Sequence, residues 1–168
     1  LVVIFYIAAN VIPKIDIYRS INWSVIVLLG AMIPIGEALQ SSGGAETLSS
    51  TLIYLSYGAS PVTILFLMLI ITMLLSAVLN NVATVLVAAP ISVEIAKTLN
   101  VNPDTFLMAV AIGASCAFLT PIGHQNNTLV MGPGGYRFGD YWKLGLPLEI
   151  VITLVSIPAL LYFWPLDS

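Results

Sequence analysis

Long apolar stretches separated by short polar segments make up most of this chain. A helix that spans a bilayer needs about 20 predominantly apolar residues. Residues 23–39 are therefore predicted to form the first complete span and residues 144–164 the last. The apolar segment 1–12 is too short to span, and we interpret it as the end of a helix whose upstream part is missing.

Residues 61–97 are too long for one spanning helix. They begin with Ser60-Pro61, a favourable pair of N-cap and first helical residue. As one helix, these 37 residues would extend about 55 Å, nearly twice the hydrocarbon core of about 30 Å. Asn80-Asn81 interrupts them in the middle. We therefore predict a re-entrant helical hairpin over residues 61–97 with this pair at its tip.

A polar segment also interrupts the next apolar stretch. Asn102-Pro103 repeats the helix-start pattern, and residues 120–127 (TPIGHQNN) contain the only histidine before apolar sequence resumes. We predict a discontinuous transmembrane helix over residues 103–132. Non-helical backbone at membrane depth persists only where it is buried in protein or lines a wet cavity. The break is therefore predicted to bind a transported solute.

Composition decides the class of protein. The 168 residues are 59% hydrophobic and only 8% charged, with a mean hydropathy of +1.03, whereas soluble domains carry roughly 25% charged residues. We expect an all-α integral membrane domain over residues 1–168, with the lipid bilayer as a partner. A single cysteine, Cys116, excludes an internal disulfide and a cysteine metal cluster. No basic patch suggests nucleic acid.

The basic residues favour one orientation. Lys14 and Arg19 precede the first full span, and Arg137 and Lys143 precede the last. If the hairpin enters and leaves from outside, all four lie on the cytoplasmic side, as the positive-inside rule asks, and only Lys97 lies outside. We predict a multi-pass protein of the plasma membrane, the inner membrane in bacteria, with an external C-terminus.

The two breaks offer complementary groups. A helix that begins at membrane depth presents N–H groups and a positive dipole end, which suit an anion. The side chains expected to donate hydrogen bonds to it are Asn80, Asn81, Thr84, Asn126, Asn127 and Thr128. Unwound carbonyls suit a coupling cation, and those expected here belong to Leu79, Pro121, Ile122 and Gly123. Neither break holds an acidic residue, which argues against a proton pump or a Ca²⁺ path. For His124, solute contact, proton relay and a role in holding the loop are open alternatives.

Three motifs carry a family resemblance: SAVLNNVAT at residues 76–84 with Pro90, TPIGHQNNT at 120–128, and GPGGYRF at 132–138. They resemble the divalent anion:sodium symporter family, the citrate-transporter-like group of the ion transporter superfamily. The branch most similar is that of bacterial permeases that often carry TrkA-C domains mid-chain. The resemblance implies the C-terminal half of an inverted repeat, a missing N-terminal repeat as partner, homodimers, and a transport domain that moves past a scaffold.

The same resemblance implies site residues. The family's Ser-Asn-Thr tip signature falls on residues 80–82, where only Asn81 matches, and its Thr-Pro-Pro-Asn signature falls on residues 124–127, where only Asn127 matches. His124 and Gln125 thereby join the expected solute site. The family's sodium site falls on Leu79, Asn81, Ile122 and Gly123. No other metal and no organic cofactor is expected.

The leading hypothesis is alternating-access transport of a small anion, sulfate or a di- or tricarboxylate, coupled to Na⁺ or H⁺. The Asn-Asn tip also resembles arsenite and Na⁺/H⁺ transporters of the wider superfamily. A non-transporting scaffold or sensor is a further alternative. An intramembrane enzyme built on Ser115 and His124 is disfavoured, because small-residue runs such as residues 113–116 are the usual device for close helix packing and no HExxH motif is present.

Overall fold

The computed structural model describes residues 58–167 continuously, together with positions 34, 38, 41–44, 47, 50, 51 and 54. The predicted helix end at 1–12 and the predicted first span lie outside the described residues, apart from positions 34 and 38 in that span. The helices that the structure describes in full are α5 (Pro61–Ser76), α6 (Asn81–Leu99), α7 (Pro103–Ser115), α8 (Gln125–Met131), the short 3-10 helix η1 (Phe138–Asp140) and α9 (Tyr141–Phe163).

Side-chain caps start three of these helices, at the predicted positions Ser60 and Asn102 and also at Asn80. The hydroxyl of Ser60 accepts from the backbone N–H of Thr63 at 3.3 Å, and the side-chain oxygen of Asn80 accepts from Ala83 at 2.8 Å. Asn102 caps α7 in the same way, through the N–H of Asp104 at 3.0 Å. These bonds satisfy N–H groups that a first helical turn leaves without a partner.

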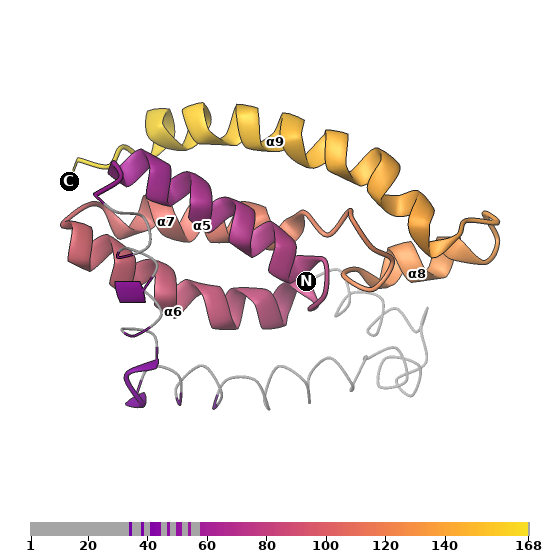
Figure 1. The fold of residues 1–168 in the computed structure, drawn as a ribbon, viewed down its shortest axis with the longest axis horizontal. Coiled ribbons are helices and arrows are strands. Elements are labelled where there is room, and N and C mark those ends of the chain that lie inside the picture. Colours follow the sequence, from indigo (N-terminus) through magenta and orange to yellow (C-terminus); the bar gives the residue numbers. More distant parts are fainter. Residues whose placement is uncertain are drawn as a thin grey trace, which may run out of the picture.

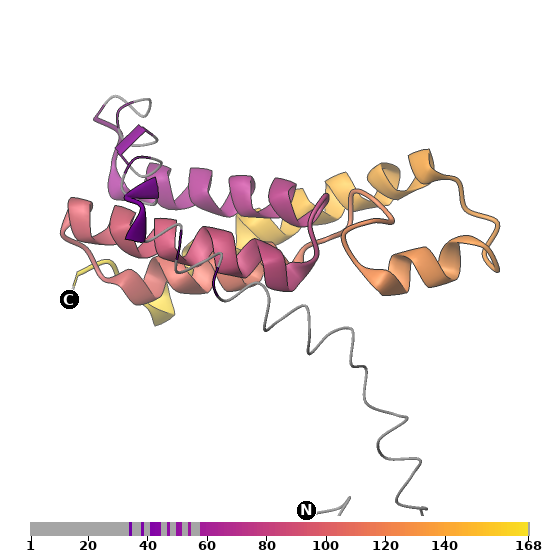
Figure 2. The same ribbon diagram turned by 90° about the horizontal axis from the view of Figure 1, so that it is seen from below.

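The helices form an elongated bundle. Figure 1 shows α6 and α9 on opposite sides of α5 and α7, and Figure 2 shows the same elements from below. Helix α7 packs against both α5 and α6. The largest fully buried side chains come from α5, α6, α7 and α9: Ile64, Leu65, Met68, Leu69, Met73, Ile95, Phe106, Val110 and Leu160. The core thus lies between α5, α6 and α7, and α9 contributes Leu160 to it.

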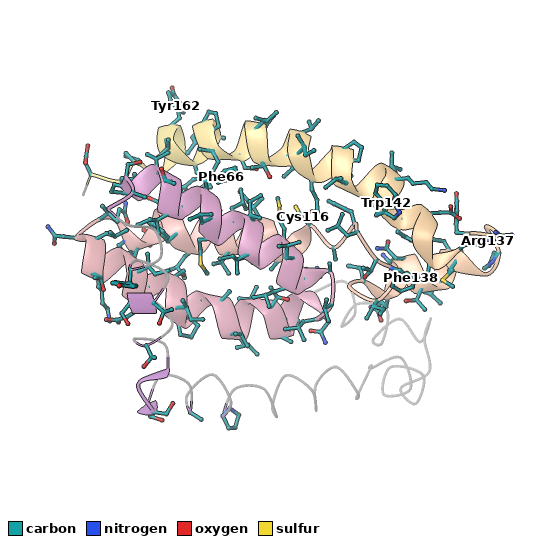
Figure 3. All side chains as sticks on the ribbon, in the orientation of Figure 1. Phe66, Cys116, Arg137, Phe138, Trp142 and Tyr162 are labelled. Atoms are coloured by element: carbon teal, nitrogen blue, oxygen red, sulfur yellow. The ribbon has the colours of Figure 1, made fainter. Side chains whose placement is uncertain are left out.

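Helix α9 has two different faces. Its buried positions recur every three or four residues and are Gly145, Glu149, Thr153, Ser156 and Leu160. Its other face exposes large apolar side chains, among them Leu144, Leu154, Val155 and Tyr162, and Tyr162 points away from the bundle in Figure 3. Such an apolar surface is suited to lipid or to another helix rather than to water.

Two helices, α6 and the segment from Phe138 to Phe163, are long and apolar enough to cross a membrane. Within the described part of the chain there is no strand, so the all-helical prediction is confirmed there, and the two apolar helices fit a membrane protein. Residues 77–80 separate α5 from α6. Whether this pair re-enters from one side stays a prediction, as does the inverted repeat, because α6 is itself long enough to span.

A close contact between α5 and α7 gives a test of the packing. A Cβ added at Gly113 would lie 2.9 Å from the Cβ of Thr72 and 3.1 Å from the carbonyl oxygen of Leu69. Gly113→Ala should therefore lower the thermal unfolding midpoint of the full-length protein in detergent, at an overpacking cost of about 1–3 kcal/mol. Gly132→Ala is the matched control, because nothing lies within 4 Å of its added Cβ. Equal midpoints for both variants would contradict this packing.

Candidate functional site

The break in the second half of the chain is centred on Pro121. In a continuous helix the carbonyl of Ala117 would accept from the N–H of residue 121, but proline has no N–H, and its ring would clash with that carbonyl. The residue before a proline also disfavours the helical region. The helix ends at Ser115 and resumes at Gln125. Apolar sequence predicts helix up to residue 119, whereas α7 ends at Ser115. Pro121 keeps the helix from continuing through the break.

Two side chains of α8 satisfy three of the carbonyls that the break releases. The amide group of Asn127 donates to the carbonyl of Ala117 at 2.8 Å and to that of Thr120 at 3.3 Å. The hydroxyl of Thr128 donates to the carbonyl of Pro121 at 2.6 Å. Asn127 therefore supplies the hydrogen bond to Ala117 that Pro121 cannot.

The break is also tied to the tip between α5 and α6. The hydroxyl of Ser76 donates to the carbonyl of Ala114 at 2.6 Å, and the hydroxyl of Thr120 donates to the carbonyl of Ala77. A Cβ at Gly123 would collide with the carbonyl oxygen of Ser76, so only glycine allows the two backbones to approach this closely. The two interruptions predicted from sequence are in contact.

A cavity of about 630 Å³ lies where they meet. Its lining residues come from the tip, the start of α6, the break and α8: Asn80, Asn81, Val82, Ile122, Gly123, His124, Gln125, Thr128 and Leu129. The structure thus brings together seven residues of the expected solute and cation sites from segments about 40 residues apart in the sequence.

Five expected site residues do not line this cavity. The carbonyl of Pro121 accepts from Thr128. Thr84 is fully buried, and its hydroxyl donates to the carbonyl of Asn80 at 3.1 Å. Asn126 is exposed and does not belong to the lining residues. Asn127 uses its side-chain amide to hold the break, and Leu79 lies outside the lining residues. Thr84 and Asn127 therefore stabilise the backbone of the two interruptions.

Uncharged residues line the cavity, and several backbone groups in and next to its wall have no hydrogen-bond partner. Among the described residues, the backbone N–H groups of Asn81 and Val82 have no hydrogen-bond acceptor, and the carbonyls of Leu79, Ile122 and Gly123 have no donor. No Lys, Arg, Asp or Glu belongs to the residues that line it. The described part of the chain also holds no group of three or more His, Cys, Asp and Glu residues able to bind a metal. Carbonyl oxygens are thus the groups on this wall suited to a cation.

His124 caps α8. Its Nδ1 atom accepts from the N–H of Asn126 at 3.2 Å, so in the neutral ring the proton sits on Nε2. The imidazole therefore helps to hold the loop, and His124 also lines the cavity. From this position His124 can both support the loop and contact a solute in the cavity.

Sequence reasoning missed four residues around the site. Ser76 and Thr120 link the two interruptions, and the hydroxyl of Tyr141 donates to the carbonyl of Asn127 at 2.6 Å. Glu149 of α9 is buried, and its Oε1 atom has no hydrogen-bond partner in the described part of the chain. A signal for Glu149 was present, because an acidic residue inside a spanning segment indicates a functional site. Tyr141 carried no such signal.

The sequence model of the citrate transporter family matches residues 1–167. This chain belongs to that family. It is 41% identical to an uncharacterized transporter of Synechocystis over 84% of its own length and 23% of the relative's length. It is 37% identical to the uncharacterized transporter YfbS of Escherichia coli, over 88% of its own length and 24% of the length of that protein.

A sodium-dependent dicarboxylate transporter of Staphylococcus saprophyticus is 26% identical over 88% of this chain and 28% of that protein. The chain therefore spans about a quarter of the length of these relatives. Their names place it among transporters rather than enzymes. The family resemblance carried by residues 76–84, 120–128 and 132–138 is confirmed.

The role of Asn127 can be separated from solute binding. Asn127→Ala leaves the carbonyl of Ala117 without its donor, and an unsatisfied buried polar group costs about 1–3 kcal/mol. We expect a lower thermal unfolding midpoint of the full-length protein in detergent without any solute present. Asn127→Asp should be at least as harmful, because a carboxylate would face two carbonyl oxygens. Asn126→Ala is the matched neighbour and should unfold like the wild type; equal loss in both alanine variants would contradict the assignment.

Proposed function

We propose that the full-length protein is a secondary transporter that moves a small anion, sulfate or a di- or tricarboxylate, across the membrane by alternating access. Transport is coupled to Na⁺ or H⁺. In this proposal the chain is the C-terminal repeat, residues 61–97 form a re-entrant hairpin, and the cavity between the hairpin tip and the break is one wall of the solute site. Membership of the citrate transporter family supports the transport of an anion.

The observation that carries the proposal is the cavity shared by the two interruptions. Its volume of about 630 Å³ falls in the range of ligand pockets, about 300–1,000 Å³. Two separate helix discontinuities contribute its walls. Hydrogen bonds from side chains to backbone carbonyls fix the conformation of both. A membrane protein keeps irregular backbone at depth only where protein or a wet cavity satisfies it.

Donors at the start of α6 suit an anion. The free N–H groups of Asn81 and Val82 belong to the first turn of a helix of 19 residues, where the helix dipole adds positive potential. The side chain of Asn81 makes only one long contact, 3.4 Å from its Oδ1 atom to the hydroxyl of Ser76. That hydroxyl makes its shorter hydrogen bond, 2.6 Å, to the carbonyl of Ala114. Its amide can therefore donate to a solute oxygen.

The opposite wall suits the coupling cation. Ile122 and Gly123 line the same cavity, and their carbonyls accept no hydrogen bond from the described residues. Unwound carbonyls of this kind coordinate Na⁺ in transporters with broken helices. If the coupling ion is Na⁺, they form its proposed subsite with Leu79 and the tip at Asn81. The remaining ligands would come from the other repeat.

The surrounding architecture follows from the same proposal. A partner repeat would pack on this half and complete the site, because inverted-repeat transporters build it at the repeat interface. We propose a homodimer in the plasma membrane, with the C-terminus outside. Trp164 and the residues after it contact the start of α7 through Thr105, whose hydroxyl donates to the carbonyl of Trp164 at 2.7 Å. The C-terminus therefore lies at the same end of the bundle as the start of α7.

Uptake of radiolabelled anions tests the site in the full-length protein reconstituted into vesicles. A panel of sulfate, succinate and citrate, each with and without Na⁺, identifies the solute and the ion. Asn81→Ala should raise the apparent KM for the transported anion by about tenfold, equivalent to the loss of a hydrogen bond of about 1.4 kcal/mol to a charged group. Its unfolding midpoint without solute should stay close to that of the wild type.

Asn126→Ala is the control for the same substitution outside the cavity, and it should transport like the wild type. If Asn81→Ala transports the anion with the KM of the wild type, the tip does not belong to the solute site. A wild-type protein that takes up none of the anions and shows no anion-dependent thermal shift would contradict the proposed function itself.

A further inference from the structure

Glu149 is buried at membrane depth without a counter-charge. It lies about 12 Å along α9 from Tyr141, at 1.5 Å per residue, so it falls within the span of 23 residues. The residue is only 6% exposed. Its Oε1 atom is fully covered and has no hydrogen-bond partner in the part of the chain that the structure describes. A carboxyl group in this situation is a functional candidate by default.

The surroundings of Glu149 are almost wholly apolar. It lines a cavity of about 280 Å³ between α5, the break and α9, together with Phe66, Ile70, Met73, Leu74, Leu119, Leu146, Ile150, Thr153 and Leu154. The hydroxyl of Thr153 already donates to the backbone carbonyl of Glu149 at 2.7 Å. Few oxygen atoms remain to complete the coordination of a metal cation, which takes several oxygen ligands at once.

The other titratable group in contact with this region is a thiol. Cys116, at the start of the break, lies within electrostatic reach of Glu149, and Figure 3 shows it between α5 and α9. In this cavity α5 contributes no titratable residue, and α9 contributes only Glu149. Ionising the carboxyl in the observed conformation would thus leave an unpaired charge in an apolar site, which is costly. The neutral, protonated acid fits this conformation.

Glu149 also faces the segment that builds the solute site. Because α7 ends at Ser115, the N–H of Phe118 makes no helical hydrogen bond, and it lies within reach of the Glu149 carboxyl. One turn earlier on α9, a Cβ at Gly145 would collide with the carbonyl oxygen of Phe118. Phe118 and Leu119 lead directly into Thr120, which holds the hairpin tip. The carboxyl and the solute cavity thus share one short piece of backbone.

We propose that Glu149 is the proton-binding residue that couples H⁺ to anion transport. The carboxylate takes up one proton from water in a conformation that separates α9 from residues 118–119, and the neutral acid is buried when they pack together as observed. Reopening on the other side of the membrane returns the proton to water. This inference rests on the proposed function and names its coupling ion.

The test uses the full-length protein in proteoliposomes with the membrane potential clamped at zero. One proton per anion supports about tenfold accumulation for each unit of pH difference, since one pH unit is worth 1.36 kcal/mol. Wild-type uptake should rise when the outside is made acidic. Glu149→Gln, a neutral mimic of the acid, should keep anion exchange at equal pH and lose this stimulation. Glu149→Asp should retain it in part, and Glu94→Gln, at a surface carboxylate paired with Lys97, should retain it fully.

An infrared measurement decides the protonation state independently of transport. The carbonyl stretch of a protonated carboxylic acid should be present in the wild type near neutral pH and absent from Glu149→Gln. Gradient-driven uptake equal to the wild type in Glu149→Gln would overturn the proposal, as would wild-type uptake that depends on Na⁺ alone. If Glu149→Gln loses both anion exchange and thermal stability, and the wild type shows no acid band, Glu149 has a structural role and the proposal is wrong. If no anion is transported, the proposed function fails, while an absent acid band still refutes proton binding at Glu149.

Discussion

The hydrogen bonds to the carbonyls around Pro121 are the interaction on which the site depends. A proline at this position removes the donor for the carbonyl of Ala117 and blocks the helix. Asn127 supplies the missing donor at 2.8 Å from the other side of the break. Without that bond an unsatisfied carbonyl would be buried in a membrane protein, where backbone groups must be paired. With it, nine residues of irregular backbone persist between α7 and α8.

The same principle joins the break to the hairpin tip. Ser76 and Thr120 each use a hydroxyl to satisfy a carbonyl of the other segment, and Gly123 gives the space for that approach. The side chains that hold the backbone are therefore distinct from the groups left free to bind a solute. Asn127 belongs to the first set, and Asn81, with the N–H of Val82, belongs to the second.

The helical class and the two interruptions could be predicted from sequence, because hydropathy and the Ser60-Pro61 and Asn102-Pro103 start signals are local patterns. Their pairing was expected from the complementary groups that the two breaks offer. The division of roles between Asn81 and Asn127 could not, because it depends on which carbonyls lie within reach after folding. The position of Glu149 beside the break could not be predicted either, because it depends on how α9 packs. The sequence predicted the break at residues 120–127, whereas the backbone leaves the helix at 116–124.

The most direct test of the central claim, that the two interruptions form one anion cavity, is ligand protection of introduced cysteines. Val82→Cys and Gln125→Cys, made separately in a full-length background free of other cysteines, place a thiol on each wall of the cavity. We predict that the transported anion slows maleimide labelling at both positions with the same half-saturating concentration, while Asn126→Cys is labelled at an unchanged rate. Protection at only one wall, or at neither, would contradict a shared site.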